Sequence, residues 1–263
     1  MRLLPRIAVT IISCWSATVA AENSYLFMIP AERLDGESGR LSTSVKATLH
    51  VPDGERAAGI IASGGALEIV AADAEQITII VGAAETMAEP PDAGDLRQSF
   101  VIDFDEAAVE TVLSEVRANL GEKPGIAELT EFVFNYIDNK AYLGTFDLAS
   151  KVAARRTGDC TEHAVLLTAL ARANGYPARV AIGVALLESA GRVAAYGHAW
   201  TEIHDGSAWQ LADATMPEGE AQVTSVRYLP LMNLDNEGPG FSLDLARLGQ
   251  IQPAKVTEIR NAP

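Results

Sequence analysis

The stretch GDCTEHAVLLTAL, residues 158–170, places a cysteine where an apolar helix is expected to start. Asp159 is a good N-cap residue, and the apolar residues after it predict a helix over residues 159–173. The free N–H groups and the dipole at a helix N-terminus stabilise negative charge, which favours the reactive thiolate form of Cys160. The stretch therefore predicts a nucleophilic cysteine on the first turn of a helix.

A histidine and an aspartate follow on a predicted β-hairpin. The segment GHAWTEIH, residues 197–204, alternates like a strand, and WQLAD, residues 209–213, forms its partner across a short turn. The hairpin would bring Asp213 beside His198, where the carboxylate can accept the ring N–H and support an imidazolium. A thiolate needs such a proton partner, so Cys160, His198 and Asp213 are the candidate catalytic residues.

The N-terminal part of the chain has the period of β-strands. Short β-branched or alternating runs predict strands at residues 45–51, 67–70 and 77–81, with a further strand at 100–103. Turn signals such as Asp53-Gly54 separate these runs. We therefore expect a small β-rich N-terminal region over residues 22–103.

From residue 104 the period changes to that of helices, and strands follow the helices. The predicted helices cover residues 107–120, 129–137, 147–155 and 159–173; the predicted strands cover 178–187, 198–204 and 208–212. Helices followed by antiparallel strands predict an α+β fold rather than a wound parallel sheet. Residues 104–263 are expected to form the catalytic domain.

Four short motifs in this domain resemble the core of the bacterial transglutaminase-like superfamily. They are GDCTEHA at 158–164, GYPARV at 175–180, GHAW at 197–200 and DAT at 213–215. The stretch FDLAS, residues 146–150, resembles the periplasmic branch of that superfamily. The resemblance implies a papain-like core with a Cys-His-Asp triad at Cys160, His198 and Asp213. It also implies acyl transfer on amide bonds by a protease, an amidase or a transglutaminase.

The first residues predict export. Arg2 and Arg6 precede an apolar stretch that ends in small residues, so residues 1–21 are expected to be a signal peptide cleaved after Ala20 or Ala21. Alternatively, the stretch IISC, residues 11–14, resembles a lipoprotein box and would anchor the chain through Cys14. In both cases Cys160 is the one free thiol of a periplasmic or secreted protein.

The charge of the chain limits its partners. Among 263 residues, 20 are Lys or Arg and 35 are Asp or Glu, which gives a formal net charge of −15. Such a charge repels phosphate backbones and anionic membrane surfaces, so nucleic acid is not expected as a partner. No cofactor motif and no membrane span after the signal peptide are predicted. A protein or peptide amide is the expected substrate, and the oligomeric state stays open.

Two other interpretations of the same residues remain. Cys160 and His163, one helical turn apart, could join His198 and Asp213 in a zinc site. Alternatively, the fold could serve as a non-catalytic binding scaffold.

Three residues near the predicted triad have simpler roles than catalysis. His163 is expected to pack against the helix, and Glu162 to complement the helix dipole. Trp200 either walls the site or packs as a half-buried strand residue.

Overall fold

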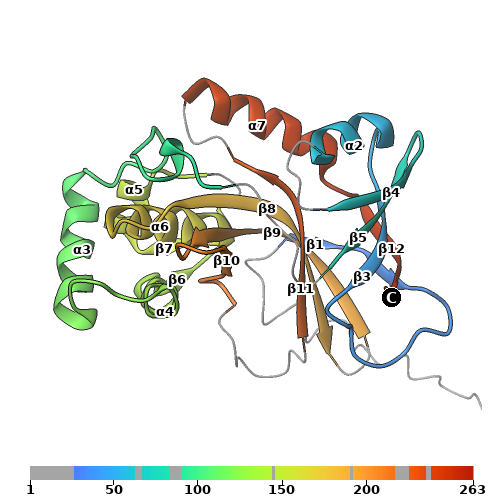
Figure 1. The fold of residues 1–263 in the computed structure, drawn as a ribbon, viewed down its shortest axis with the longest axis horizontal. Helices are drawn as coiled ribbons and strands as arrows, with labels where there is room; N and C mark the ends of the chain where they lie inside the picture. Colours follow the sequence, from blue (N-terminus) through green and yellow to red (C-terminus); the bar gives the residue numbers. More distant parts are fainter. Residues whose placement is uncertain are drawn as a thin grey trace, which may run out of the picture.

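The computed structural model describes residues 27–62, 67–82, 90–143, 146–189, 192–216, 225–234 and 238–262. The predicted signal peptide, residues 1–21, and Cys14 lie outside the described residues. The described chain contains two five-stranded sheets with helices packed on them (Figure 1). This mixed architecture, with mostly antiparallel strands, confirms the predicted α+β fold class.

The first sheet, which we call the central sheet, is built around one long hairpin. Its strand order is β1 (Phe27–Ile29), β9 (Arg192–His204), β8 (Ala178–Ser189) and β11 (Ser225–Asn233), and β10 (Trp209–Ala212) pairs with the other end of β9. β8 and β9 pair continuously, from Ala178 opposite Ile203 to Ser189 opposite Arg192. The hairpin is longer than the sequence predicts because both strands continue past their expected ends.

Four helices gather at one end of the central sheet (Figure 1). They are α3 (Ala107–Leu120), α4 (Ile126–Tyr136), α5 (Ala149–Arg155) and α6 (Cys160–Ala173), each within about a turn of its predicted position. α6 contacts the three other helices and also β8 and β9. Every side chain from Ala164 to Ala171 is consequently buried. The parallel strands β6 (Asn139–Lys140) and β7 (Thr157–Gly158) pair just before α6 begins.

The second sheet, which we call the terminal sheet, combines strands from both ends of the chain. Its order is β2 (Ala31–Arg33), β12 (Lys255–Asn261), β3 (Val45–His50), β5 (Gln76–Val81) and β4 (Glu68–Ala72). The helix α2 (Gly54–Ala62) packs on β4 and β5, and α7 (Gly238–Ile251) packs on α2 (Figure 1). A short 3-10 helix, η1 (Ala93–Asp95), lies between this sheet and α3 in the chain.

Each of the two sheets contains strands from both the N-terminal and the C-terminal part of the sequence. β1 belongs to the central sheet, although it directly precedes β2 of the terminal sheet. β12, near the C-terminus, pairs with β2 and β3 of the terminal sheet. Each sheet therefore takes strands from both sides of residue 103. The domain boundary at residues 103 and 104 stays a prediction.

Two local predictions are wrong. Residues 100–103 form no strand; they belong to a turn in which Ser99 N–H donates to the Ile102 carbonyl at 3.1 Å. The Asp53-Gly54 turn signal instead begins helix α2, because the Asp53 side chain accepts the Arg56 N–H at 3.0 Å. An aspartate followed by glycine suits a helix start as well as a turn, and the tertiary contacts of α2 decide between them.

Across the described ranges, no helix is both long enough and apolar enough to cross a membrane.

Candidate active site

The start of α6 is built by a reciprocal cap around Cys160. The Asp159 side chain accepts the Thr161 N–H at 2.9 Å, and Glu162 Oε2 accepts the Asp159 N–H at 2.9 Å. Cys160 occupies the first helical position, so its N–H is one that the helix itself leaves without a partner. Cys160 is 7% exposed, which puts the sulfur in a largely water-free environment at the positive end of a helix.

The segment before the helix holds this cap in place. Ala141 N–H donates to the Gly158 carbonyl and Leu143 N–H to Asp159 Oδ2, both at 3.2 Å. Gly158 has no room for a side chain, because a Cβ there would lie 2.2 Å from Cβ of Glu162. The glycine of the GDC motif thus allows Glu162 to fold back onto the Asp159 N–H.

His198 and Asp213 form a buried pair across the hairpin. His198 Nε2 donates to Asp213 Oδ2 at 2.7 Å, with side-chain exposures of 0% and 4%. The β9–β10 pairing explains this contact: Ala212 lies opposite Thr201, and the chain leaves β10 at Asp213 toward His198. The structure therefore brings together the two residues that the hairpin pattern predicts to be neighbours.

Asp213 is held in its ionised form by hydrogen bonds. Burial would raise the pKa of this carboxyl, but the charge of His198 and bonds from His198, Tyr228 and the Thr215 N–H lower it. Oδ1 accepts the N–H groups of Thr215 and Met216 at 2.8 and 3.3 Å. A carboxylate with these donors can carry its charge in the interior.

The second ring nitrogen of His198 is available to Cys160. Among the described residues, Nδ1 is buried and makes no hydrogen bond of ordinary geometry. Burial would lower the pKa of His198, but the charge and hydrogen bond of Asp213, with a smaller effect from the nearby Cys160 side chain, raise it well above 6.5. An imidazolium between a thiol and a carboxylate is the arrangement that a thiolate nucleophile requires.

Two aromatic rings pack beside the histidine, one of which the sequence does not predict. The Trp200 ring lies 6.2 Å from that of His198, so Trp200 does wall the histidine. Tyr228 of β11 lies 6.1 Å from His198 between ring centroids, and its hydroxyl donates to Asp213 Oδ2 at 2.7 Å. No element was predicted at β11, so no signal in the sequence pointed to Tyr228.

His163 and Glu162 are more deeply buried than the sequence suggests. His163 Nδ1 donates to the Asp159 carbonyl at 2.6 Å, and burial lowers the pKa of His163 to about 4. Burial also raises the pKa of Glu162 to about 7, with a further increase from the charge of Asp159. His163 is therefore a neutral packed residue at neutral pH, as expected, and Glu162 caps the helix by accepting the Asp159 N–H.

The zinc interpretation finds no support in the side-chain arrangement. In the part of the chain that the structure describes, no group of three or more His, Cys, Asp or Glu side chains is arranged to hold a metal ion. His198 and His163 each use one ring nitrogen in a hydrogen bond within the protein.

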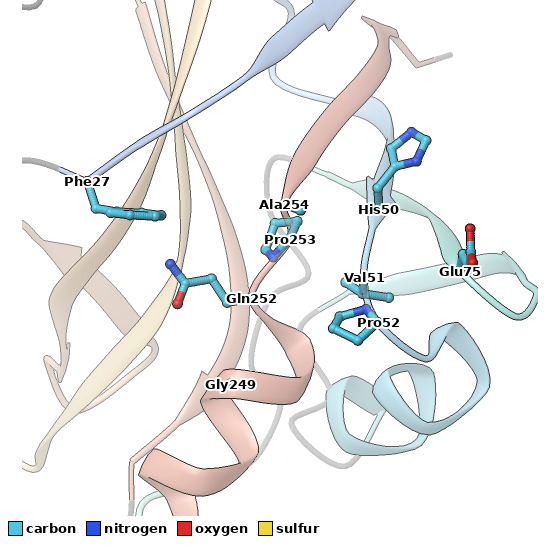
Figure 2. A pocket seen from close by; sticks show the side chains of 9 residues that line it. All are labelled: Phe27, His50, Val51, Pro52, Glu75, Gly249, Gln252, Pro253 and Ala254. Atoms are coloured by element: carbon cyan, nitrogen blue, oxygen red, sulfur yellow. The ribbon is translucent and has the colours of Figure 1, made fainter.

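A groove of about 460 Å³ opens elsewhere, where β1 of the central sheet approaches the terminal sheet. Figure 2 shows Phe27 of β1, Gln252 after α7 and Pro52 after β3 around it. No residue of the predicted triad lines this groove, and its His50 ring is already bonded to Thr257 Oγ1 at 2.8 Å. The predicted triad therefore lies outside this groove.

Cys160 thus stands at the start of a buried helix, and His198 and Asp213 form a bonded pair on an antiparallel hairpin, within an α+β fold. Residues 111–214 match the family model of the transglutaminase-like superfamily. The matched range contains Cys160, His198 and Asp213. The superfamily resemblance carried by the four motifs is thereby confirmed.

Two solved structures resemble the chain at low sequence identity. A candidate cysteine protease from Cytophaga hutchinsonii is 15% identical, with a TM-score of 0.43, over 77% of this chain and 89% of that one. The periplasmic domain of TgpA from Pseudomonas aeruginosa is 14% identical, with a TM-score of 0.43, over 73% of this chain and 81% of that one. No curated protein matches the sequence.

Proposed function

We propose that the chain is a cysteine-dependent enzyme that acts on amide bonds of proteins or peptides. Cys160 is the nucleophile, His198 the acid and base, and Asp213 the carboxylate that supports the imidazolium. The observation that carries this proposal is the 2.7 Å contact from His198 Nε2 to Asp213, which leaves Nδ1 for Cys160. A buried ion pair is costly unless both partners are bonded, and such a pair beside a helix-capped thiol suits catalysis.

The first half-reaction forms a thioester. The Cys160 sulfur, as thiolate, bonds to the amide carbonyl carbon, and the negative charge moves to the carbonyl oxygen. The Cys160 N–H at the helix N-terminus stabilises this oxyanion. The C–N bond then breaks, and the His198 imidazolium gives its proton to the leaving amine.

The second half-reaction restores the thiol. Neutral His198 takes a proton from water or from a second amine, which then bonds to the thioester carbonyl carbon. The C–S bond breaks and the thiolate leaves, paired again with the imidazolium. Water gives a carboxylic acid, as in a protease or amidase, and an amine gives a new amide, as in a transglutaminase.

Two probes of the mature protein test this function. Iodoacetamide should alkylate wild-type Cys160 faster than a free thiol at pH 6, as followed by peptide mass spectrometry. Casein incubated with a fluorescent primary amine should be cleaved or labelled, and Cys160→Ala should reduce that turnover by at least about a thousandfold. Turnover that survives Cys160→Ala would falsify the enzyme proposal, and a slow thiol with no turnover favours the scaffold interpretation.

We also propose that the protein is exported. Residues 1–21 have the basic start, apolar core and small-residue exit of a signal peptide. Fractionation of expressing cells, with mass analysis of the mature N-terminus, should find a chain that begins at residue 21 or 22. A chain that begins at a lipidated Cys14 would instead support the anchored alternative.

A further inference from the structure

Tyr228 and His198 share one carboxylate oxygen. Tyr228 Oη and His198 Nε2 each donate to Asp213 Oδ2, both at 2.7 Å. The other oxygen, Oδ1, accepts backbone N–H groups from Thr215 and Met216. Oδ1 thus ties the carboxylate to its own turn, while Oδ2 receives the two side-chain donors.

The tyrosine ring is fixed beside the histidine by packing. Its centroid lies 5.1 Å from the Trp200 ring and 6.1 Å from the His198 ring. Tyr228 stands on β11 opposite Ala185 of β8, so its position depends on the pairing of two strands rather than on the hairpin that carries His198 and Asp213. The hydroxyl is therefore supplied to the His–Asp pair from a separate element.

Two donors to one oxygen weaken each other. Each donor withdraws negative charge from the oxygen and leaves less for the other. The hydrogen bond from Tyr228 lowers the pKa of Asp213, which shows that the phenol stabilises the carboxylate charge. By linkage, the phenol bonds more strongly when His198 is neutral than when His198 is an imidazolium. The phenol thus favours release of the histidine proton.

We propose that Tyr228 is a positioning residue that limits how tightly Asp213 holds the proton on His198. The proposal rests on the proposed function, in which His198 must give that proton to a leaving amine. A general acid works best when its proton affinity is close to the operating pH. Without the second donor, Asp213 would hold the imidazolium proton more tightly, and His198 would be a weaker acid.

Besides Tyr228 of β11 and Tyr196 of β9, α6 and β6 bring titratable groups near this pair. Cys160 raises the pKa of His198, so its removal brings the His198 titration closer to neutrality. Burial lowers the pKa of His163 of α6 to about 4; the charge of Lys140 of β6 lowers it further, and that of Asp213 raises it. His163 therefore stays neutral across the alkaline range in which His198 titrates.

Titration of the histidine rings tests the proposal. The chain has 4 histidines, so the ring signals can be assigned by substitution in protein labelled at histidine. In a Cys160→Ala background, Tyr228→Phe should raise the His198 midpoint by about half a pH unit or more. Tyr196→Phe is the matched control, because Tyr196 lies on β9 two residues before His198 and makes no bond to Asp213. It should leave the midpoint unchanged.

A second variant tests the proposal even if Tyr228→Phe does not fold. Site-specific 3-fluorotyrosine at position 228 keeps the ring and donates a stronger hydrogen bond, so it should lower the His198 midpoint. A midpoint that is unchanged or lower in Tyr228→Phe, or higher with fluorotyrosine, overturns the proposal. A different experiment tests the proposed function. Slow alkylation of wild-type Cys160 by iodoacetamide would contradict that function without changing the titration result for His198.

Discussion

The two sheets differ in the polar side chains that they bury. In the terminal sheet, the buried positions of β3 and β5 are apolar pairs, with Val45 opposite Val81 and Leu49 opposite Ile77. The buried Thr48 hydroxyl of β3 is bonded to Glu258 at 2.8 Å. These two strands have the pattern that stability alone requires.

The central sheet carries a buried charged pair, His198 and Asp213. Thr215 Oγ1 and, on the adjoining helix α6, His163 Nε2 are buried without a hydrogen-bond partner among the described residues, and His198 Nδ1 makes no hydrogen bond of ordinary geometry. Each such atom costs free energy of about 1–3 kcal/mol, so a cluster of them is a feature that stability does not explain. The comparison supports the proposed site, because several of these atoms belong to the predicted triad or to residues next to it in the sequence.

The largest expected contrast is between two aspartates. Asp213 bonds to His198, whereas within the described part of the chain the Asp103 carboxylate accepts hydrogen bonds from Ser150, from the backbone N–H at 2.8 Å and from the hydroxyl at 2.6 Å. Asp213→Asn should reduce turnover of casein by about a thousandfold or more, since an amide cannot stabilise an imidazolium. Asp103→Asn should leave turnover within about threefold and lower the melting temperature slightly.

The aspartate comparison fails if the two variants lose similar amounts of activity. In that event Asp213 would be a structural residue like Asp103, and the unpaired atoms around it would need another explanation. Circular dichroism of both variants separates lost chemistry from lost folding.

The next contrast is between two glycines that have no room for a side chain, one in each sheet region. A Cβ at Gly183 of β8 would lie 1.9 Å from the Leu229 carbonyl oxygen, and one at Gly54 of α2 would lie 2.1 Å from the Asp73 carbonyl oxygen. Backbone cannot give way as a side chain can, so both Gly→Ala changes should destabilise by about 3 kcal/mol or more. Only Gly183→Ala should also slow alkylation of Cys160 in the folded protein, because Gly183 lies opposite His198.

Gly59 is the matched control for the crowded glycines. It lies on α2, and a Cβ added there would meet no described atom within 4 Å outside the helix backbone, so Gly59→Ala should stabilise by about 0.5–1 kcal/mol. Thermal unfolding measures all three variants. Equal alkylation rates in Gly183→Ala and Gly54→Ala would mean that the site does not depend on the close approach of β11 to β8.

Much of the fold could be predicted because its signals are local. Caps and apolar period locate α3 and α6 in the sequence, and alternation locates β3 and β5. The strands that were missed depend on distant partners: β12 pairs with β3, whose residues lie about 200 positions earlier. Nothing in a short window of sequence specifies such a pairing.

The candidate site also combines residues with local sequence signals and a residue whose position depends on a distant strand pairing. Cys160 has a cap beside it, and His198 and Asp213 share one hairpin, so local sequence patterns are enough to place all three. Tyr228 reaches Asp213 only through the register of β11 on β8, which shifts between Pro230 and Met232. Pro230 lies within β11, and a proline is tolerated there because β11 is an edge strand of the central sheet.

The smallest expected effect concerns the pH dependence of stability. Glu162 ionises near pH 4.5 in an unfolded chain, and burial raises its pKa in the folded protein to about 7. Between these values the native state holds a proton that the unfolded state has lost, so the stability from this group falls as pH rises. The full penalty at pH 8.5 is on the order of 3 kcal/mol.

Glu162→Gln should remove this penalty while its amide oxygen still accepts the Asp159 N–H. The variant should unfold at a higher urea concentration than wild type at pH 8.5 and at a similar one at pH 4.5. His163, whose pKa is lowered to about 4, destabilises both proteins equally in acid, so it cancels in the difference. The exposed Glu55 in the first turn of α2 is the control from the other region, and Glu55→Gln should shift stability by less than about 0.5 kcal/mol at either pH. If Glu162→Gln behaves like Glu55→Gln, the carboxyl beside Cys160 is solvated, and the contrast between the two sheets is smaller than the buried atoms imply.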